Sequence, residues 1–221
     1  MTATIPEPTG EGRAEGRTAP SPLLVLISAP SGGGKTTLCQ RLLAARPELT
    51  RVVTCTTRPP RAGERDGTDY YFLDAGAFLK GVQEGDYLEH ATVYGNNYGT
   101  LRSEVLGKLR RGKDVLLNVD VQGAAAIRER AQEVPELKRA LVSVFLTPPS
   151  LSIVEERLRK RGTDSPAVIQ KRLSVALEEI AHWRHFDYLL VSASIDEDLR
   201  RMMAIMEAEK MRSVRVQAPE F

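Results

Sequence analysis

An apolar run followed by a glycine-rich turn constrains the fold of this chain more than any other feature. Residues 23–37 read LLVLISAPSGGGKTT. The apolar run is too short to span a membrane and is typical of a buried parallel strand. Consecutive glycines let backbone N–H groups surround an anion without clashes from Cβ atoms. The segment therefore predicts a strand, a phosphate-binding loop and the start of a helix.

The side chains of this loop suit a nucleotide triphosphate. Lys35 would reach the β- and γ-phosphates, and the Thr36 hydroxyl would coordinate Mg²⁺. Ala29 stands where the usual pattern Gly-x-x-x-x-Gly-Lys-Ser/Thr begins with glycine, although three glycines remain to form the turn. The alternative is a glycine-rich turn that binds nothing. The predicted ATP-binding residues are Ala29, Pro30, Ser31, Gly32, Gly33, Gly34, Lys35, Thr36 and Thr37.

Composition limits the class of protein. The 221 residues are 42% hydrophobic and 27% charged, as in a soluble globular chain with one sizeable core. The net charge of +2 gives no reason to expect nucleic acid or a membrane as a partner. Cys39 and Cys55 suggest neither a disulfide framework nor a metal cluster. We expect a cytoplasmic protein that is a monomer or a small homo-oligomer.

Apolar runs alternate with helical patterns along the chain. We expect helices at 36–45, 74–84, 122–131, 151–160, 166–185 and 196–212, and one that follows residue 100 and ends near 112. Strands are expected at 51–55, 86–94, 114–120, 141–147 and 187–191. This alternation predicts an α/β fold with a parallel sheet covered by helices on both faces. Residues 1–22, rich in proline and glycine, are predicted to be a disordered tail.

A second group of basic and aromatic residues lies in the loop 56–72, TTRPPRAGERDGTDYYF. Arg58 and Arg61 flank two prolines, whose rigid backbone would hold the two guanidinium groups in a fixed relation. That arrangement suits bidentate binding of a second phosphate. Tyr70 and Tyr98 could add hydroxyl donors. The alternative is a solvated basic loop.

Three further arginines suggest phosphoryl transfer. Arg157 and Arg161 lie four residues apart on one predicted helix, and Arg172 follows on the next. Such arginines can stabilise the charge of a transferring phosphoryl group. Alone they would be more typical of a soluble surface. Together with the two phosphate-binding features they predict a donor site and an acceptor site.

These motifs resemble the guanylate kinase family, which phosphorylates GMP with ATP. The resemblance covers residues 22–211 and rests on APSGGGKTT, TTRPPRAGERDGTDYYF, GDYLEH followed by NNYGT, NVDVQG, and RLRKRGTDS with KRL. It implies a P-loop NTPase-type core, a GMP-binding insert and a helical lid. The implied ranges are 23–53, 101–149 and 175–212 for the core, 54–100 for the insert, 150–174 for the lid, and 1–22 and 213–221 for the tails.

The resemblance also implies residue roles. It implies Mg²⁺ bound with ATP at Thr36, and direct in-line transfer to GMP, with dGMP as a second acceptor. The guanine N1–H and N2–H₂ groups are donors that suit the Glu89 carboxylate. The implied catalytic residues are Lys35, Arg157, Arg161 and Arg172. Those implied for GMP are Thr54, Glu89, Thr100 and Asp120 at the base, Arg58, Arg61, Tyr70 and Tyr98 at the phosphate, and Gly99.

The chain departs from the family pattern at a few positions, and other functions stay open. Asn118 stands where the family generally has an acid, and Ser192 where it has an asparagine. The alternatives are a guanylate-kinase-like binding module without activity, another nucleoside monophosphate kinase, and a phosphate-loop hydrolase switch. The intact Gly-Lys-Thr and the arginines argue against the first, and Glu89 with Thr54 argues against the second. Nothing resembles the base-reading motifs of the third.

Overall fold

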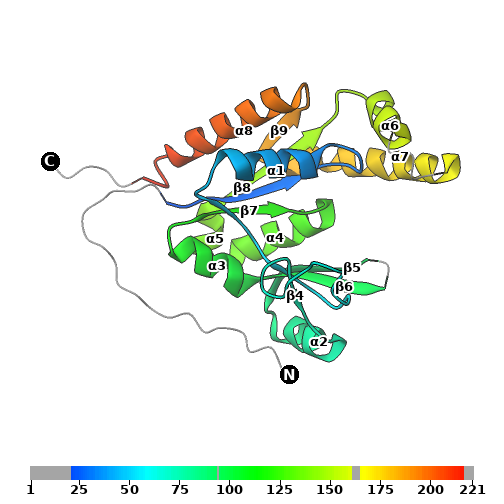
Figure 1. The fold of residues 1–221 in the computed structure, drawn as a ribbon. Helices are drawn as coiled ribbons and strands as arrows, with labels where there is room; N and C mark the ends of the chain where they lie inside the picture. The colour runs from blue at the N-terminus through cyan, green and yellow to red at the C-terminus, as the bar shows by residue number, and fades with distance from the viewer. Residues whose placement is uncertain (1–20, 94, 161–164, 217–221) are drawn as a thin grey trace.

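A five-stranded parallel sheet forms the centre of the computed structural model, which describes residues 21–93, 95–160 and 165–216 (Figure 1). The strand order is β2-β7-β1-β8-β9, and every neighbouring pair is parallel. The central strand β1 (Leu24–Ser28) is buried along its whole length. The other strands are β2 (Leu49–Arg51), β7 (Asp114–Asn118), β8 (Leu141–Thr147) and β9 (Tyr188–Val191).

Helices cover both faces of this sheet. On one face α1 (Lys35–Ala45) and α8 (Ile195–Lys210) pack on a cluster that includes Val25 and Ile27. On the other face α3 (Arg102–Arg110), α4 (Val121–Glu133) and α5 (Pro135–Ala140) bury Leu24 and Leu26. Successive side chains of a strand point to opposite faces, so a strand covered on both sides must be apolar throughout. The predicted α/β fold with a parallel sheet is confirmed.

A separate four-stranded sheet lies beside the core, in the order β4-β3-β6-β5. Strands β5 (Tyr87–Val93) and β6 (Asn96–Leu101) pair antiparallel, and β3 (Thr54–Thr56) is antiparallel to β6 and parallel to β4 (Tyr70–Phe72). Helix α2 (Ala75–Glu84) covers this sheet, and the rings of Phe78 and Tyr87 stack with centroids 4.6 Å apart. All these elements fall within residues 54–101, close to the predicted insert.

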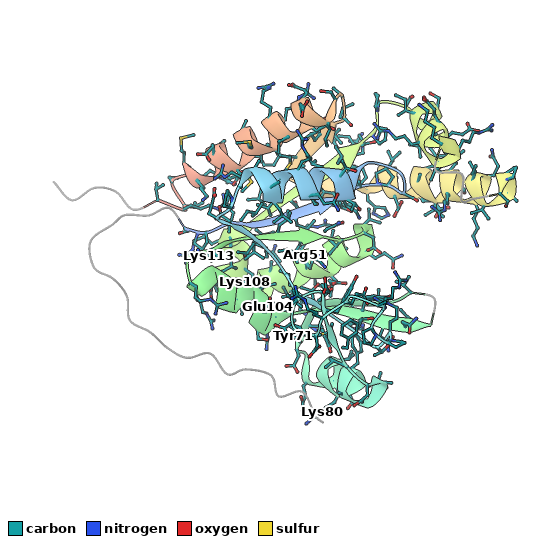
Figure 2. The ribbon with its side chains drawn as sticks, in the orientation of Figure 1. Arg51, Tyr71, Lys80, Glu104, Lys108 and Lys113 are labelled. Atoms are coloured by element: carbon teal, nitrogen blue, oxygen red, sulfur yellow. The ribbon has the colours of Figure 1, made fainter. Side chains whose placement is uncertain are left out.

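Polar contacts join this second sheet to the core. The Glu104 carboxylate on α3 accepts the Val53 N–H at 3.4 Å and pairs with Lys108 at 2.7 Å, and Figure 2 shows both side chains near the junction. Arg51 at the end of β2 donates to the Asp69 carbonyl at 3.3 Å. The connection between β2 and β3 is therefore fixed to α3 through Val53, and Arg51 just before it is bonded to the loop that leads into β4.

Two helices form a third unit with its own small apolar cluster. Helix α6 (Leu151–Lys160) and helix α7 (Pro166–Ala181) bury Val154, Leu158 and Ile169 between them. The Ser165 hydroxyl accepts the Val168 N–H at the start of α7. Figure 1 shows both helices beside the turn that leads into α1. No helix among the described residues is long and apolar enough to cross a membrane.

Several local predictions need correction. The predicted strand 51–55 is two strands, β2 and β3, which belong to different sheets. Residues 98–100 lie in β6 and do not lead directly from a turn into a helix. The helix predicted to reach residue 185 ends at Ala181 and continues as a 3₁₀ turn, His182–His185. Helix α5 was not predicted, because six residues are too few to show a helical period.

The ordered fold extends past the predicted boundary at residue 212. The Arg215 guanidinium is buried, forms an ion pair with Glu209, and donates to the carbonyls of Arg139 at 2.9 Å and Leu141 at 3.1 Å. Its own carbonyl accepts the Ser21 N–H at 2.9 Å. Arg215 therefore belongs to the packed structure, and the sequence showed no sign of this because its contacts are distant in the chain.

Replacing Arg215 by Met should destabilise the fold by about 3 kcal/mol, because it leaves the Glu209 carboxylate buried without its main cation. Arg212 contacts the same carboxylate at 3.3 Å but is 58% exposed, so Arg212→Met should cost less than about 1 kcal/mol. Urea denaturation followed by circular dichroism measures both. Equal losses in the two variants would contradict the proposed difference between the buried and the exposed pair.

Candidate active site

The turn between β1 and α1 has the geometry of a phosphate-binding loop. Gly32 and Gly34 have φ values of 80° and 93°, which residues with a side chain rarely adopt. The Gly33 N–H donates to the Pro30 carbonyl at 2.8 Å, and a Cβ at Gly33 would lie 2.9 Å from that oxygen. Ala29 is buried in the cluster under α1 and α8. The three glycines are each needed, while the Ala29 methyl group packs in the core.

A cavity of about 200 Å³ opens over this loop. It is lined by all of residues 29–37, the predicted ATP-binding set, together with Glu179. The Lys35 Nζ donates to the Val119 carbonyl, just after β7, at 2.7 Å. Burial lowers the pKa of Lys35, and the charge of Asp120 opposes that shift. The structure thus gathers backbone donors and a cation in one cavity, as an anion site requires.

Helix α6 lies directly on the loop. A Cβ on Gly32 would lie 3.4–3.5 Å from Val154 and Leu158, which is ordinary van der Waals contact, so α6 packs directly over the loop at this glycine. The Arg157 guanidinium donates to the Gly33 carbonyl at 3.4 Å. The predicted catalytic residue Arg157 is therefore adjacent to the cavity. Arg172 is partly buried on α7, and Arg161 lies outside the described residues.

A second constellation forms on the β5–β6 hairpin. Glu89 and Thr100 are cross-strand partners, and the Thr100 hydroxyl donates to Glu89 Oε1 at 2.6 Å. Burial raises the pKa of Glu89, and the Thr100 hydrogen bond opposes the shift. A Cβ on Gly123 would lie 3.4 Å from Glu89 Oε2, so this oxygen faces the first turn of α4. Within the described part of the chain, Oε2 accepts no hydrogen bond.

Asp120 lies between the two constellations. Its carboxylate caps α4 by accepting the Gly123 N–H at 2.8 Å. Its negative charge contributes to the raised pKa of Glu89, and it opposes the lowering of the Lys35 pKa by burial. The turn between β7 and α4 therefore links the loop cavity to the hairpin.

Arg58 lies close to other predicted phosphate-binding side chains of the second sheet. Its guanidinium lies 5.5 Å from the centroid of the Tyr70 ring, and the Tyr98 ring lies 6.2 Å from that of Tyr70. Its Nη2 donates to both carboxylate oxygens of Glu64, at 2.8 and 2.9 Å. The hydrogen bond to Glu64 raises the pKa of Arg58. Sequence reasoning missed Glu64, whose only signal is an acid three residues after Arg61 in a basic loop.

Other predicted residues lie apart from these contacts. The Arg61 side chain is exposed, and only its backbone N–H joins the network, donating to Glu64 at 2.7 Å. Thr54 lies in β3 opposite Tyr70. A Cβ on Gly99 would lie 2.7 Å from the Tyr87 ring, so close packing requires a glycine at this position.

Two departures from the family pattern have clear places. Asn118 ends β7 with an exposed side chain. The Ser192 hydroxyl is buried and donates to Asp198 at 2.6 Å, so it serves the start of α8. The Asp198 carboxylate also accepts the Ala193 N–H at 3.0 Å. This pairing holds the end of β9 against α8.

Glu179 was also missed by sequence reasoning. It lies near the end of α7, partly buried, and its Oε2 accepts the Ser31 N–H at 3.0 Å. Burial raises the pKa of Glu179, while the Ser31 hydrogen bond and the charge of Lys35 oppose the shift. No local pattern could reveal it, because a glutamate inside a helix is ordinary and its partner is 148 positions away.

Residues 21–209 match the family model described as guanylate kinase. The chain belongs to the guanylate kinase family. It is 44% identical to the guanylate kinase of Coxiella burnetii over 85% of this chain and 88% of that one. It is 43% identical to that of Carboxydothermus hydrogenoformans, over 88% and 92%. The crystal structure of guanylate kinase from Anaplasma phagocytophilum matches with a TM-score of 0.66 and 33% identity, over 89% and 90%.

Thr100→Val should raise the pKa of Glu89 further, because the hydroxyl hydrogen bond favours the ionised carboxylate. A ¹³C NMR titration of the Glu89 carboxyl carbon measures the change. Thr92 lies on the same hairpin but donates to Asn97, so Thr92→Val is a matched control that should leave the titration unchanged. A Glu89 pKa that stays constant or falls in Thr100→Val would contradict the assignment.

Proposed function

We propose that this guanylate kinase family member transfers the γ-phosphate of MgATP to GMP, and also to dGMP, giving ADP and the nucleoside diphosphate. The observation that carries the proposal is the turn after β7. Its Val119 carbonyl accepts a hydrogen bond from Lys35 of the loop, and a Cβ on Gly123 would lie 3.4 Å from both Asp120 Oδ1 and Glu89 Oε2. A donor site and an acceptor site that share one turn suit direct transfer between two bound nucleotides.

Guanine recognition rests on Glu89. The Thr100 hydroxyl satisfies one carboxylate oxygen, and the other is available for the N1–H and N2–H₂ donors of guanine. Adenine has an acceptor at N1, and its binding would leave the second oxygen of this partly buried carboxylate unpaired. A site built to pair such groups can discriminate by about 10⁴.

Recognition of the GMP phosphate rests on Arg58 with Tyr70 and Tyr98. Glu64 and the Tyr70 ring hold the Arg58 guanidinium in one orientation before any ligand binds. A guanidinium fixed in this way loses little conformational entropy when it binds an anion. Arg61 would complete the site only by reorienting its exposed side chain.

The donor site is the cavity over residues 29–37. Its Thr36 hydroxyl would hold Mg²⁺. The described residues contain no group of three His, Cys, Asp or Glu side chains that could hold a metal, and Mg²⁺ bound with ATP takes most of its ligands from phosphates and water. When bound, the ion neutralises charge on the β- and γ-phosphates. Both cysteines are buried and free, which fits a cytoplasmic setting.

In this mechanism the protein positions the two substrates and neutralises the charge of the transferring group. The acceptor oxygen of GMP is already anionic, so an in-line attack on the γ-phosphorus needs no general base and no covalent intermediate. Lys35 and Arg157, which border the loop, would neutralise the transferring phosphoryl group, with Arg161 and Arg172 as further cations from the lid. Closure of the lid would exclude water and suppress hydrolysis of ATP.

The test of this function is ADP formation from MgATP with GMP, dGMP, AMP, UMP or no acceptor. We expect turnover that depends on GMP or dGMP and falls by at least about 10³-fold in Lys35→Ala, which loses the main cation of the loop. Lys80→Ala is the control, since Lys80 is an exposed residue that Figure 2 shows on α2, away from the parallel sheet of the core. ADP formation that is independent of the acceptor would overturn the proposal.

Glu89→Gln should lower kcat/KM for GMP by about 10²- to 10³-fold, because the amide has one acceptor oxygen, so its NH₂ must face either the Thr100 hydroxyl or the donors of guanine. Steady-state kinetics with GMP and AMP measure the loss and the change in discrimination. Glu84→Gln, an exposed change at the end of α2, should leave both unchanged. Unaltered discrimination in Glu89→Gln would move base recognition to another residue.

A further inference from the structure

A carboxylate of the chain occupies a backbone donor of the phosphate loop. Glu179 Oε2 accepts the Ser31 N–H at 3.0 Å, and Glu179 lines the same cavity as residues 29–37. It comes from α7, which begins at Pro166 within the predicted lid. Its neighbour Glu178 is exposed, so the helix surface offers solvated positions for an acid one residue away. Glu179 is therefore directed at the loop by its position on the helix.

The charges around Glu179 are those of an anion site. Lys35 on α1 and His182 in the turn after α7 favour the ionised form of the Glu179 carboxylate. Asp120 in the turn after β7 opposes it. Burying a carboxylate is costly unless its oxygens are hydrogen-bonded. The loop supplies that hydrogen bond with a donor of the kind that binds phosphate.

A phosphate and this carboxylate cannot both be favourable ligands of the cavity. Each is an anion, and each needs the N–H groups that surround the loop. Like charges a few ångströms apart in a partly dry site repel strongly. Binding of a triphosphate must therefore release the carboxylate from Ser31 or work against its charge.

We infer that Glu179 is a displaceable internal ligand of the phosphate loop. In the nucleotide-free enzyme it satisfies the Ser31 N–H, and the triphosphate expels it. The inference rests on the proposed binding of ATP at the loop. Because Glu179 belongs to α7, its release couples occupancy of the donor site to the helix that begins in the lid. Glu179 thus weakens the binding of anions at the donor site. When an anion binds, the contact between the loop and α7 is lost.

The binding test compares wild type with Glu179→Gln, Glu179→Ala and Glu178→Gln. Isothermal titration calorimetry with MgATP and with inorganic tripolyphosphate, without acceptor, gives each Kd. Glutamine keeps an oxygen that can accept the Ser31 N–H but removes the charge, and alanine removes the ligand entirely. We expect both Glu179 variants to bind about five- to tenfold more tightly than wild type, and Glu178→Gln to match wild type.

The outcomes separate this inference from the proposed function. If wild type binds both ligands and the Glu179 variants bind no more tightly, the inference is overturned while ATP binding stands. Weaker binding in the Glu179 variants would also overturn it, and would make Glu179 a residue that supports the bound phosphate. If wild type binds neither ligand, the proposed ATP site fails and the inference fails with it.

A second measurement tests the contact without nucleotide. Hydrogen–deuterium exchange of the Ser31 amide should be about tenfold faster in Glu179→Ala than in wild type or Glu178→Ala, because the alanine variant leaves that N–H without its acceptor. Equal exchange in all three folded proteins would show that Glu179 does not bind the Ser31 N–H in solution, and would overturn the inference.

Discussion

The hydrogen bond from Lys35 to the Val119 carbonyl is the contact on which the site depends. It joins two residues 84 positions apart because β1 and β7 are parallel neighbours, with Ile27 opposite Asn118, so their carboxyl ends reach the same edge of the sheet. The phosphate loop follows one strand and the Asp120 turn follows the other. Sheet topology, more than any local motif, therefore places the donor loop beside the residues that lead to Glu89.

Two features that we propose to bind phosphate each hold a carboxylate from the same chain. Glu64 binds Arg58 in the second sheet, and Glu179 binds the Ser31 N–H in the loop. The physical reason is common to both, since partly buried donors are costly when unpaired. The two carboxylates differ in consequence. Glu64 orients a side chain, whereas Glu179 occupies a backbone donor of the proposed ATP site.

Close approach of the backbone sets the spacing of the site. Gly33 lies against the Pro30 carbonyl, Gly99 against the Tyr87 ring, and Gly123 against Glu89. Each contact would place an added Cβ within 3.4 Å of its neighbour. At Gly33 and Gly99 these distances exclude any larger residue, whereas at Gly123 an added Cβ would be in contact with Glu89.

The sequence by itself determined the features that arise from neighbouring residues. The strand, glycines and Lys35 of the loop and the α/β alternation could be predicted, because their chemistry is contained in short segments. Only the tertiary structure decided the contacts of Glu64 and Glu179, the packing role of Gly99 and the burial of Arg215. A charged residue carries no mark of its partner in the sequence around it, because folding alone brings the two together.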